Sequence, residues 1–253
     1  MNDLSTLTRI AKEAGALLLS LASNGKRADR EADLFWKAAL AVAFPGQPVV
    51  SEETFAVSQL AQFAGRVWLI DPLDGTASYT RGEESYTTMA TLVERGRPIL
   101  AVVHQPATGS TYAAARGEGA FRNGRRIRVS SRATLAEMRL VHRHTMSNNL
   151  PAIIAALPCA EKAVCGSLGL KLSLIASGRF DLTVYDSEPN LWDTLPGILI
   201  LEEAGGQVTD LFGRPVTADR QKASGLLASN GHIHKQLLRK IQPLSAIHQR
   251  GTR

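Results

Sequence analysis

Apolar residues recur every three or four positions at the start of the chain, a spacing that places them on one face of a helix. These residues are Leu4, Leu7, Ile10, Ala11, Ala14, Leu17, Leu18 and Leu21. We expect this helix to end at Asn24-Gly25, because glycine commonly stops a helix. A second amphipathic helix is predicted over residues 29–44, and Pro45-Gly46 ends it.

Apolar and β-branched runs separated by turn residues follow, and this pattern predicts strands. The predicted strands cover residues 49–50, 66–70, 86–94, 99–104 and 111–115. Asn123-Gly124 indicates a further hairpin, because this dipeptide favours a type I′ turn. We therefore expect an antiparallel sheet in the first half of the chain.

From about residue 130 strands alternate with helices. Strands are predicted at residues 139–141, 162–164, 182–184 and 207–209, and helices at 150–157, 168–176 and 192–204. Such alternation is typical of a mixed or parallel sheet. The sequence thus predicts an α+β half over residues 1–130 and an α/β half over residues 131–253.

The composition indicates a globular protein. Of 253 residues, 44% are hydrophobic and 21% are charged, which excludes a disordered or fibrous chain. No apolar run reaches the ~18 residues of a membrane span, and the first residues lack the basic start of a secretory signal. We therefore expect a cytoplasmic protein without a membrane partner. Cys159 and Cys165 lack a C-x-x-C spacing, which disfavours a disulfide framework or a zinc site.

The formal net charge of +6 raises the question of a nucleic-acid partner. Five basic residues and no acid follow Asn230, which leaves 24 basic and 23 acidic residues in the rest of the chain. A second basic cluster flanks the Asn123-Gly124 turn: Arg122, Arg125, Arg126, Arg128 and Arg132. These arginines are either solvated hairpin residues or a patch that steers anionic ligands. Nucleic acid is an open partner, but not the expected one.

The segment Asp71-Pro72-Leu73-Asp74-Gly75-Thr76 is the strongest local indication of chemistry. Two carboxylates three positions apart follow a predicted buried strand, where proline fixes the backbone and glycine permits unusual backbone angles. Such a turn can direct both carboxylates and the Leu73 carbonyl at one divalent cation, since Mg²⁺ prefers oxygen ligands. An ordinary acidic turn is the alternative for this segment taken alone.

Three separated segments together resemble the inositol monophosphatase family of Mg²⁺-dependent, lithium-sensitive phosphomonoesterases. They are Ser51-Glu52-Glu53, the 71–76 loop, and Trp192-Asp193 followed by Glu203-Ala204-Gly205-Gly206. Gly166-Ser167 and Gly178-Arg179-Phe180-Asp181 also fit the family pattern. The resemblance runs from about Ala14 to about Ala228 and implies a layered αβαβα sandwich.

The resemblance also implies a role for each matching residue. Metal ligands for two tight Mg²⁺ sites, with Li⁺ as an inhibitor, would be Glu52, Asp71, the Leu73 carbonyl, Asp74 and Asp193. Catalytic residues would be Thr76 and Glu52, which orient a metal-activated water, and Asp29, which supports Thr76. Substrate contacts would be Gly75, Thr76, Gly166, Ser167, Asp186 and Asp193, and Glu53 would lie behind the metal ligands. A homodimer is implied as well.

The chain departs from the family pattern in two places. The loop that ends at Asp29 is short and has Lys26 where the family has threonine, which puts a third metal in question. A helix N-cap is the alternative role for Asp29. Residues 186–190 lack the motifs of both the inositol phosphatase and the nucleotide-bisphosphate branches. Asp186 and Glu188 are acceptors that suit ring hydroxyls and would repel a second phosphate, which favours polyol or amino-alcohol monophosphates over nucleotide bisphosphates.

The sequence therefore predicts Mg²⁺-dependent hydrolysis of inositol-1-phosphate or a similar polyol or sugar phosphate. The alternative enzymes are a 3′(2′),5′-bisphosphate nucleotidase and a histidinol-phosphate phosphatase. The alternative outside catalysis is a family member that binds RNA or a transcription complex through its arginines and its basic C-terminal region.

Overall fold

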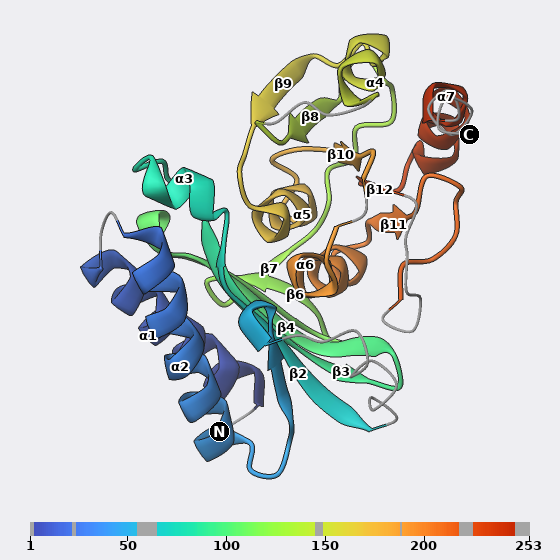
Figure 1. Ribbon diagram of the computed structural model, residues 1–253. Helices are drawn as coiled ribbons and strands as arrows, with labels where there is room; N and C mark the ends of the chain where they lie inside the picture. Colours follow the sequence, from blue (N-terminus) through green and yellow to red (C-terminus); the bar gives the residue numbers. More distant parts are fainter. Residues whose placement is uncertain are drawn as a thin grey trace, which may run out of the picture.

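The computed structural model describes residues 3–21, 24–54, 65–144, 149–187, 189–217 and 225–245. Within these ranges the chain forms two β-sheets that lie between layers of helices (Figure 1). The strands of the larger sheet all precede residue 130, and those of the smaller sheet all follow it.

The larger sheet has the strand order β1-β2-β3-β4-β5-β6-β7. Its strands are β1 (Val49–Ser51), β2 (Arg66–Asp74), β3 (Thr87–Glu94), β4 (Arg97–Gln105), β5 (Ser110–Ala115), β6 (Gly119–Arg122) and β7 (Arg125–Ile127). β1 runs parallel to β2, and each later pair is antiparallel. The antiparallel sheet predicted for the first half is confirmed, with β1 as a parallel addition at one edge.

The smaller sheet has the strand order β11-β12-β10-β8-β9. Its strands are β8 (Arg139–His142), β9 (Glu161–Val164), β10 (Leu182–Tyr185), β11 (Gln207–Thr209) and β12 (Leu226–Ser229). β8 is parallel to β9 and β10, whereas β12 is antiparallel to β10 and β11. This is the mixed sheet that the alternation of strands and helices predicts.

Helices form three layers around the two sheets (Figure 1). α1 (Asp3–Ser20) and α2 (Gly25–Ala43) cover one face of the larger sheet, α5 (Leu168–Ala176) and α6 (Leu191–Glu203) lie between the sheets, and α4 (Leu150–Ala156) and α7 (His234–Ser245) pack on the outer face of the smaller sheet. Short connections are η1 (Glu52–Thr54), α3 (Thr76–Thr80) and η3 (Pro106–Thr108). The αβαβα sandwich is thus confirmed. None of the described helices is long and apolar enough to cross a membrane.

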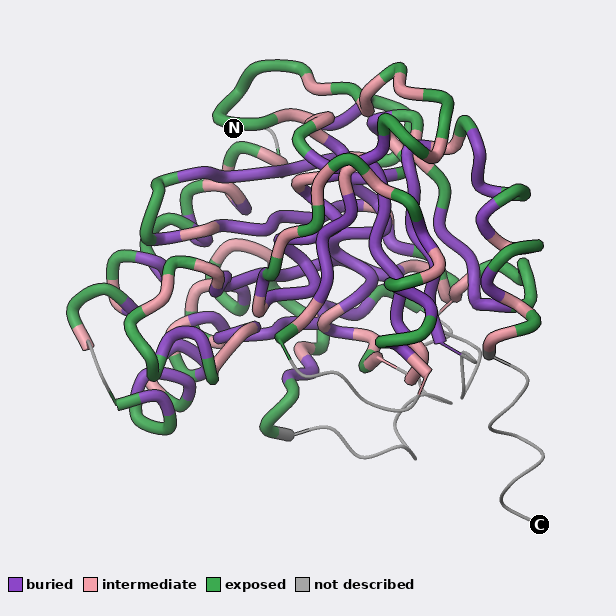
Figure 2. The backbone as a smooth tube through the Cα atoms, turned by 90° about the horizontal axis from the view of Figure 1, so that it is seen from above, coloured by how far each residue is buried: buried purple, intermediate pink, exposed green. Residues whose placement is uncertain are grey.

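β2 is buried on both faces, because its side chains alternate between two hydrophobic cores. Trp68 and Ile70 pack against α1 and α2, whereas Val67 and Leu69 face the core that contains α5 and α6. Figure 2 shows buried segments passing through the middle of the molecule. A strand packed on two faces gives a firm base to the carboxylates at its end.

The start of α2 differs from the prediction. The helix begins at Gly25 and not near residue 29, and Asn24 caps it by accepting a hydrogen bond from the Arg27 N–H at 3.2 Å. A Cβ at Gly25 would lie only 2.8 Å from Thr80 Oγ1, so glycine lets α2 start close against α3. Asp29 lies inside α2, and its alternative role as a helix N-cap is therefore wrong.

Candidate active site

The turn at the end of β2 holds the two carboxylates of the 71–76 motif. Asp71 is almost fully buried, and its Oδ1 accepts a hydrogen bond from the Leu73 N–H at 3.0 Å. Gly75 has a φ of +89°, and a Cβ there would lie 2.9 Å from the Ser85 carbonyl oxygen, so the turn requires glycine. Thr76 Oγ1 donates a hydrogen bond to the Leu73 carbonyl at 3.0 Å. The motif thus forms a turn with a fixed backbone.

Glu52, Asp71 and Asp193 converge from three separate segments. Each offers one carboxylate oxygen, and these oxygens lie within 4.8 Å of one another. Because β1 and β2 are parallel, Glu52 and Asp71 emerge at the same edge of the sheet, and Asp193 reaches them from the first turn of α6. Clustered carboxylates are the donors that Mg²⁺ prefers in proteins. The three side chains therefore form a candidate metal site.

Burial and neighbouring charges both raise the pKa values of this cluster. Burial raises the pKa of Asp71 well above its ordinary value, and the charges of Asp74, Asp193 and Glu52 raise it further. Burial, Asp74 and Glu52 raise the pKa of Asp193 to about 8. A divalent cation would favour the ionised carboxylates and offset these shifts. The charge and the donor chemistry of the cluster thus both fit Mg²⁺.

Asp74 lies beside the cluster and is fixed by the start of α5. Its Oδ2 accepts hydrogen bonds from Ser167 Oγ at 2.6 Å and from the Gly169 N–H at 3.0 Å. Burial raises the pKa of Asp74, whereas the Ser167 hydroxyl and the nearby charge of Lys171 lower it. Ser167 also lies 2.8 Å from Thr87 through their hydroxyl oxygens. Ser167 therefore orients Asp74, and because Ser167 is fully buried the substrate contact predicted for it stays a prediction.

Asp29 is buried on α2 and is close enough to the cluster to interact with it. Burial raises the pKa of Asp29 to about 7, and the charges of Glu52, Glu53 and Asp33 add to the shift. Glu53 itself is exposed. In the described part of the chain the Thr76 hydroxyl donates to the Leu73 carbonyl and not to Asp29. The support of Thr76 by Asp29 therefore stays a prediction without a hydrogen bond to represent it.

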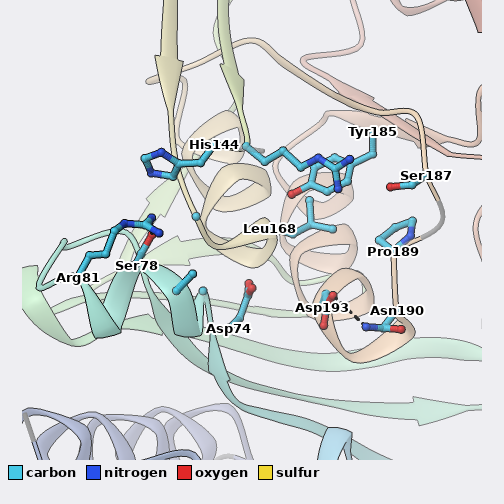
Figure 3. Close-up of a pocket in the computed structure, with 14 residues that line it drawn as sticks. Asp74, Ser78, Arg81, His144, Leu168, Tyr185, Ser187, Pro189, Asn190 and Asp193 are labelled. Carbon is cyan, nitrogen blue, oxygen red and sulfur yellow. Dashed lines mark hydrogen bonds between the residues drawn. The ribbon is translucent and has the colours of Figure 1, made fainter. Parts of the chain in front are cut away.

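A cavity of about 310 Å³ opens beside Asp74 and Asp193 (Figure 3). Its lining residues are Asp74, Gly75, Ala77, Ser78, Arg81, Arg143, His144, Gly166, Leu168, Tyr185, Ser187, Pro189, Asn190 and Asp193. Of the predicted substrate contacts, Gly75, Gly166 and Asp193 are in this lining. The cavity is therefore placed to hold a small molecule next to the carboxylates.

Asp186 is directed away from this cavity. Its Oδ2 accepts a hydrogen bond from the Leu150 N–H at the start of α4 at 3.0 Å, and its Oδ1 lies 3.4 Å from Arg143 Nη2. The Asp186 side chain is only 4% exposed. It therefore orients Arg143 and α4, and it is not available to a hydroxyl of a ligand in the cavity. Glu188, predicted as a second acceptor, lies outside the described residues.

Comparison with known proteins identifies the family and the fold. Residues 11–246 match the model of the inositol monophosphatase family. The chain belongs to this family. A solved IMPase from Thermotoga maritima has a TM-score of 0.87 and 29% identity, over 97% of this chain and 99% of that chain. The resemblance inferred from three short segments is thus confirmed over nearly the whole length.

Curated relatives in the inositol monophosphatase family have different names. A fructose-1,6-bisphosphatase/inositol-1-monophosphatase from Thermotoga maritima is 32% identical over 215 residues, 84% of this chain and 80% of the relative. A putative Nus factor SuhB from Neisseria meningitidis serogroup B is 30% identical over 266 residues, 94% of this chain and 97% of the relative. A 3′(2′),5′-bisphosphate nucleotidase CysQ from Aggregatibacter actinomycetemcomitans is 31% identical over 203 residues, 76% of each chain. Family membership supports a phosphomonoesterase with Mg²⁺, without identifying its substrate.

Several lining residues of this family member belong to no motif recognised in the sequence, and those with charged or aromatic side chains are Arg81, Arg143, His144 and Tyr185. Arg81 follows α3, and the other three lie at or just beyond the ends of β8 and β10. These two strands are parallel neighbours, so residues at their carboxyl ends emerge at one edge of the sheet. The shared edge of β8 and β10 was the one feature that could have indicated these three residues. It depends on the strand order and not on the local sequence pattern.

Proposed function

We propose that this inositol monophosphatase family member is a Mg²⁺-dependent phosphatase that acts on small phosphate monoesters of the polyol or sugar class, with inositol-1-phosphate among the candidates. The observation that carries the proposal is the convergence of Glu52, Asp71 and Asp193, within 4.8 Å, beside a cavity of about 310 Å³. Clustered carboxylates with raised pKa values next to a cavity mark a functional site more often than a structural one.

Each residue at the carboxylate end of the cavity has a defined part in the proposal. Glu52, Asp71, Asp74, Asp193 and the Leu73 carbonyl would hold Mg²⁺, in two tight sites. When bound, Mg²⁺ supplies a Lewis acid that neutralises phosphate charge and makes water more acidic. Ser167 and Gly169 keep the Asp74 carboxylate in position through their hydrogen bonds to Oδ2.

The turn that begins α3 would position the phosphate and the attacking water. Gly75 and Gly166 line the cavity, where their backbone groups would contact the phosphate. The Thr76 hydroxyl donates its proton to the Leu73 carbonyl, so its oxygen is left to accept a hydrogen bond from water. Thr76 and Glu52 would together orient that water. The nearby carboxylates of Asp29 and Glu53 would influence the protonation of Glu52.

Further properties are proposed from family membership. They are inhibition by Li⁺, a homodimeric assembly and a cytoplasmic location. The names of two relatives also keep a bisphosphate nucleotidase and a transcription-complex role as alternatives, and histidinol phosphate as a substrate comes from the sequence analysis. For the RNA-binding alternative, Arg132 of the basic cluster is paired with buried Asp181, whereas Arg122 is exposed beside the Tyr112 ring.

Release of inorganic phosphate from a substrate panel tests this proposal. The panel contains inositol-1-phosphate, sugar phosphates, nucleotide phosphates and histidinol phosphate, each with Mg²⁺ and with a chelator. We expect hydrolysis of at least one ester with Mg²⁺ and none with the chelator. Binding to RNA that falls steeply with added salt, without any phosphate release, would instead favour the nucleic-acid alternative.

A further inference from the structure

The charged residues that line the cavity fall into two groups at different places (Figure 3). Asp74 and Asp193 form the carboxylate end, where the metal site lies. Away from that end the charged or titratable lining residues in the described part of the chain, apart from Tyr185, are Arg81, Arg143 and His144, and none of these is acidic. Arg81 comes from the segment after α3, and Arg143 and His144 come from the segment after β8. Two distant parts of the sequence therefore build one basic wall.

Glu83 fixes one half of this basic wall. Arg81 donates to Glu83 through Nε at 2.6 Å and through Nη2 at 3.0 Å, and His144 Nε2 lies 3.1 Å from the same carboxylate. The hydrogen bonds from Arg81 and Ser78 lower the pKa of Glu83 to about 2, so it is ionised at neutral pH. Glu83 is not among the lining residues, which places it behind Arg81 and His144 as seen from the cavity.

Asp186 and Tyr185 fix the other half in the same manner. The Arg143 guanidinium lies over the Tyr185 ring at 5.3 Å from its centroid, and Asp186 lies 3.4 Å from Nη2. The Asp186 side chain is only 4% exposed and does not line the cavity, whereas Arg143 does. Each arginine is thus held by an acid outside the cavity and exposes part of a planar, multi-donor group to the inside.

We propose that Arg81 and Arg143, with His144, form a subsite for a second anionic group on the alcohol part of the substrate. The inference rests on the proposed phosphatase function and narrows its substrate class to phosphate esters that also carry a phosphate or a carboxylate. Guanidinium groups held in position bind such oxyanions through charge-assisted hydrogen bonds at a low cost in side-chain entropy. A neutral polyol would offer this basic wall no charged acceptor. Leu168, Pro189 and Tyr185 line the cavity as well and would contact the carbon skeleton.

This proposal reverses the expectation based on Asp186. Residues 186–190 are predicted from sequence to repel a second phosphate, because Asp186 and Glu188 are acidic. The structure turns Asp186 toward α4 and brings Arg143 into the cavity in its place. The charge that a ligand meets at this wall is therefore positive, and esters of cationic alcohols such as histidinol phosphate are disfavoured.

Pairs of esters that differ only in the second anion test the subsite. Suitable pairs are 2-phosphoglycerate with glycerol 2-phosphate, fructose 1,6-bisphosphate with fructose 1-phosphate, and 3′-phosphoadenosine 5′-phosphate with adenosine 3′-monophosphate. With Mg²⁺ present, we expect kcat/KM to favour the more anionic member of at least one pair by about tenfold or more, the effect of one charge-assisted hydrogen bond. The first pair tests a carboxylate and the other two test a second phosphate.

Variants then assign the preference to the basic wall. Arg81→Gln and Arg143→Gln should each lower kcat/KM for the preferred ester, which carries the second anion, by about tenfold or more, mainly through KM. They should leave kcat/KM for the partner ester without the second anion within about twofold. Arg66→Gln is the matched control, because Arg66 pairs with Glu94 at 2.7 Å at the opposite end of β2 from Asp74. It should change neither ester.

The outcomes separate the subsite from the phosphatase proposal. No preference in any pair, or an equal loss for both members in the Arg81→Gln variant, would overturn the subsite while leaving the phosphatase proposal intact. Failure to hydrolyse any ester, with or without a second anion, would contradict the phosphatase proposal itself. Arg81 contacts an exposed acid, so the Arg81→Gln variant keeps the test valid if removal of Arg143 beside buried Asp186 impairs folding.

Discussion

At the scale of single residues, the site places several carboxylates where each raises the pKa of the next. Burial is the largest cause for Asp29, Asp71 and Asp193, and the neighbouring acids add to it. A folded protein without metal must therefore either protonate these groups or bear their repulsion. A divalent cation reduces the same repulsion, so metal binding, protonation and stability are linked.

Magnesium should therefore stabilise the protein more at high pH than at low pH. Asp29 and Asp193 have folded pKa values of about 7 and about 8, above the ordinary value of 3.8. A raised folded pKa contributes stability that is complete below the ordinary value and is lost as pH rises through the folded value. We expect the increase in Tm on adding Mg²⁺ to grow between about pH 5 and about pH 8.5. An increase that is equal at both pH values, or larger in acid, would contradict this linkage.

Replacement of Asp74 by asparagine should preserve the fold and remove most activity. The neutral amide can still accept hydrogen bonds from Ser167 and Gly169, but it binds Mg²⁺ far more weakly than a carboxylate. Loss of a group that merely supports a metal ligand costs ~10–100-fold, so we expect a loss in kcat/KM of at least about 100-fold for Asp74→Asn. Glu94→Gln, at an exposed ion pair, is the control. Near-native turnover of Asp74→Asn at saturating Mg²⁺ would show that Asp74 is not a ligand.

Site residues could be predicted from sequence where a motif fixes the backbone. They could not be predicted where a side chain can point in either of two directions. Asp71 and Asp74 occupy a turn in which proline fixes the backbone and Gly75 permits the positive φ that the turn needs, so their common direction follows from the motif. Asp186 follows a strand end, where it meets either the cavity or the start of α4. That choice depends on the position of α4, which local sequence does not encode.

At the scale of elements, α6 connects the metal site to the larger sheet. Asp193 lies in its first turn, and Glu203 lies at its last residue. The Glu203 carboxylate accepts hydrogen bonds from the Gly117 N–H and the Gly119 N–H, both at 2.8 Å, in the turn between β5 and β6. The glutamate of the E-A-G-G motif is thus a structural residue that fixes the far end of the helix.

Loss of this contact should lower stability without direct loss of chemistry. We expect Glu203→Ala to reduce the free energy of unfolding by about 1–3 kcal/mol, because two backbone N–H groups lose a charged acceptor. Glu202→Ala is the matched control on the next residue, whose exposed carboxylate lies 3.6 Å from Arg116, and it should cost less than about 1 kcal/mol. Denaturant unfolding measures both. Equal losses for the two variants would contradict the structural role of Glu203.

The short connection between α1 and α2 limits how many metal ions the site can bind tightly. α1 ends at Ser20 and α2 begins at Gly25, so little chain separates them. We expect calorimetric titration of the metal-free protein with Mg²⁺ to show at most two tight sites per chain. A third tight site would mean that Asp29 or another group replaces the ligands of a longer loop.

The sequence pattern predicted the starts of α4, α5 and α6 to within one residue but not the start of α2, for a physical reason. Asn24-Gly25 suits the end of one helix and the start of another, since asparagine caps N-termini and glycine is common at both ends. The close approach of Gly25 to Thr80 on α3 makes Gly25 the start of α2. The two residues are 55 positions apart in the sequence. The local sequence pattern gives no indication of this contact.

At the scale of the whole molecule, the two sheets and the helices between them bring the site together. Residues from β2, from η1 beside it, and from the start of α6 meet at one edge, and the segments after β8 and β10 add the cavity wall. The spacing of apolar residues predicted the layers of helices and strands, because burial of one or two faces of an element gives a regular repeat of apolar positions. The strand order β11-β12-β10-β8-β9 depends on long-range pairing, and so the basic wall at its edge could not be predicted from sequence.

The Mg²⁺ dependence of phosphate release tests the central claim most directly. The initial rate is measured on one phosphate ester from the panel, with metal-stripped wild-type protein and the Asp193→Asn variant, as Mg²⁺ is added. We predict no release above buffer without metal, a saturable rise for the wild type, and no comparable rise for Asp193→Asn although its circular dichroism is unchanged. An undiminished rate in the presence of a chelator, or equal rates for the two proteins, would contradict the assignment of a metal-dependent phosphatase site to Glu52, Asp71 and Asp193.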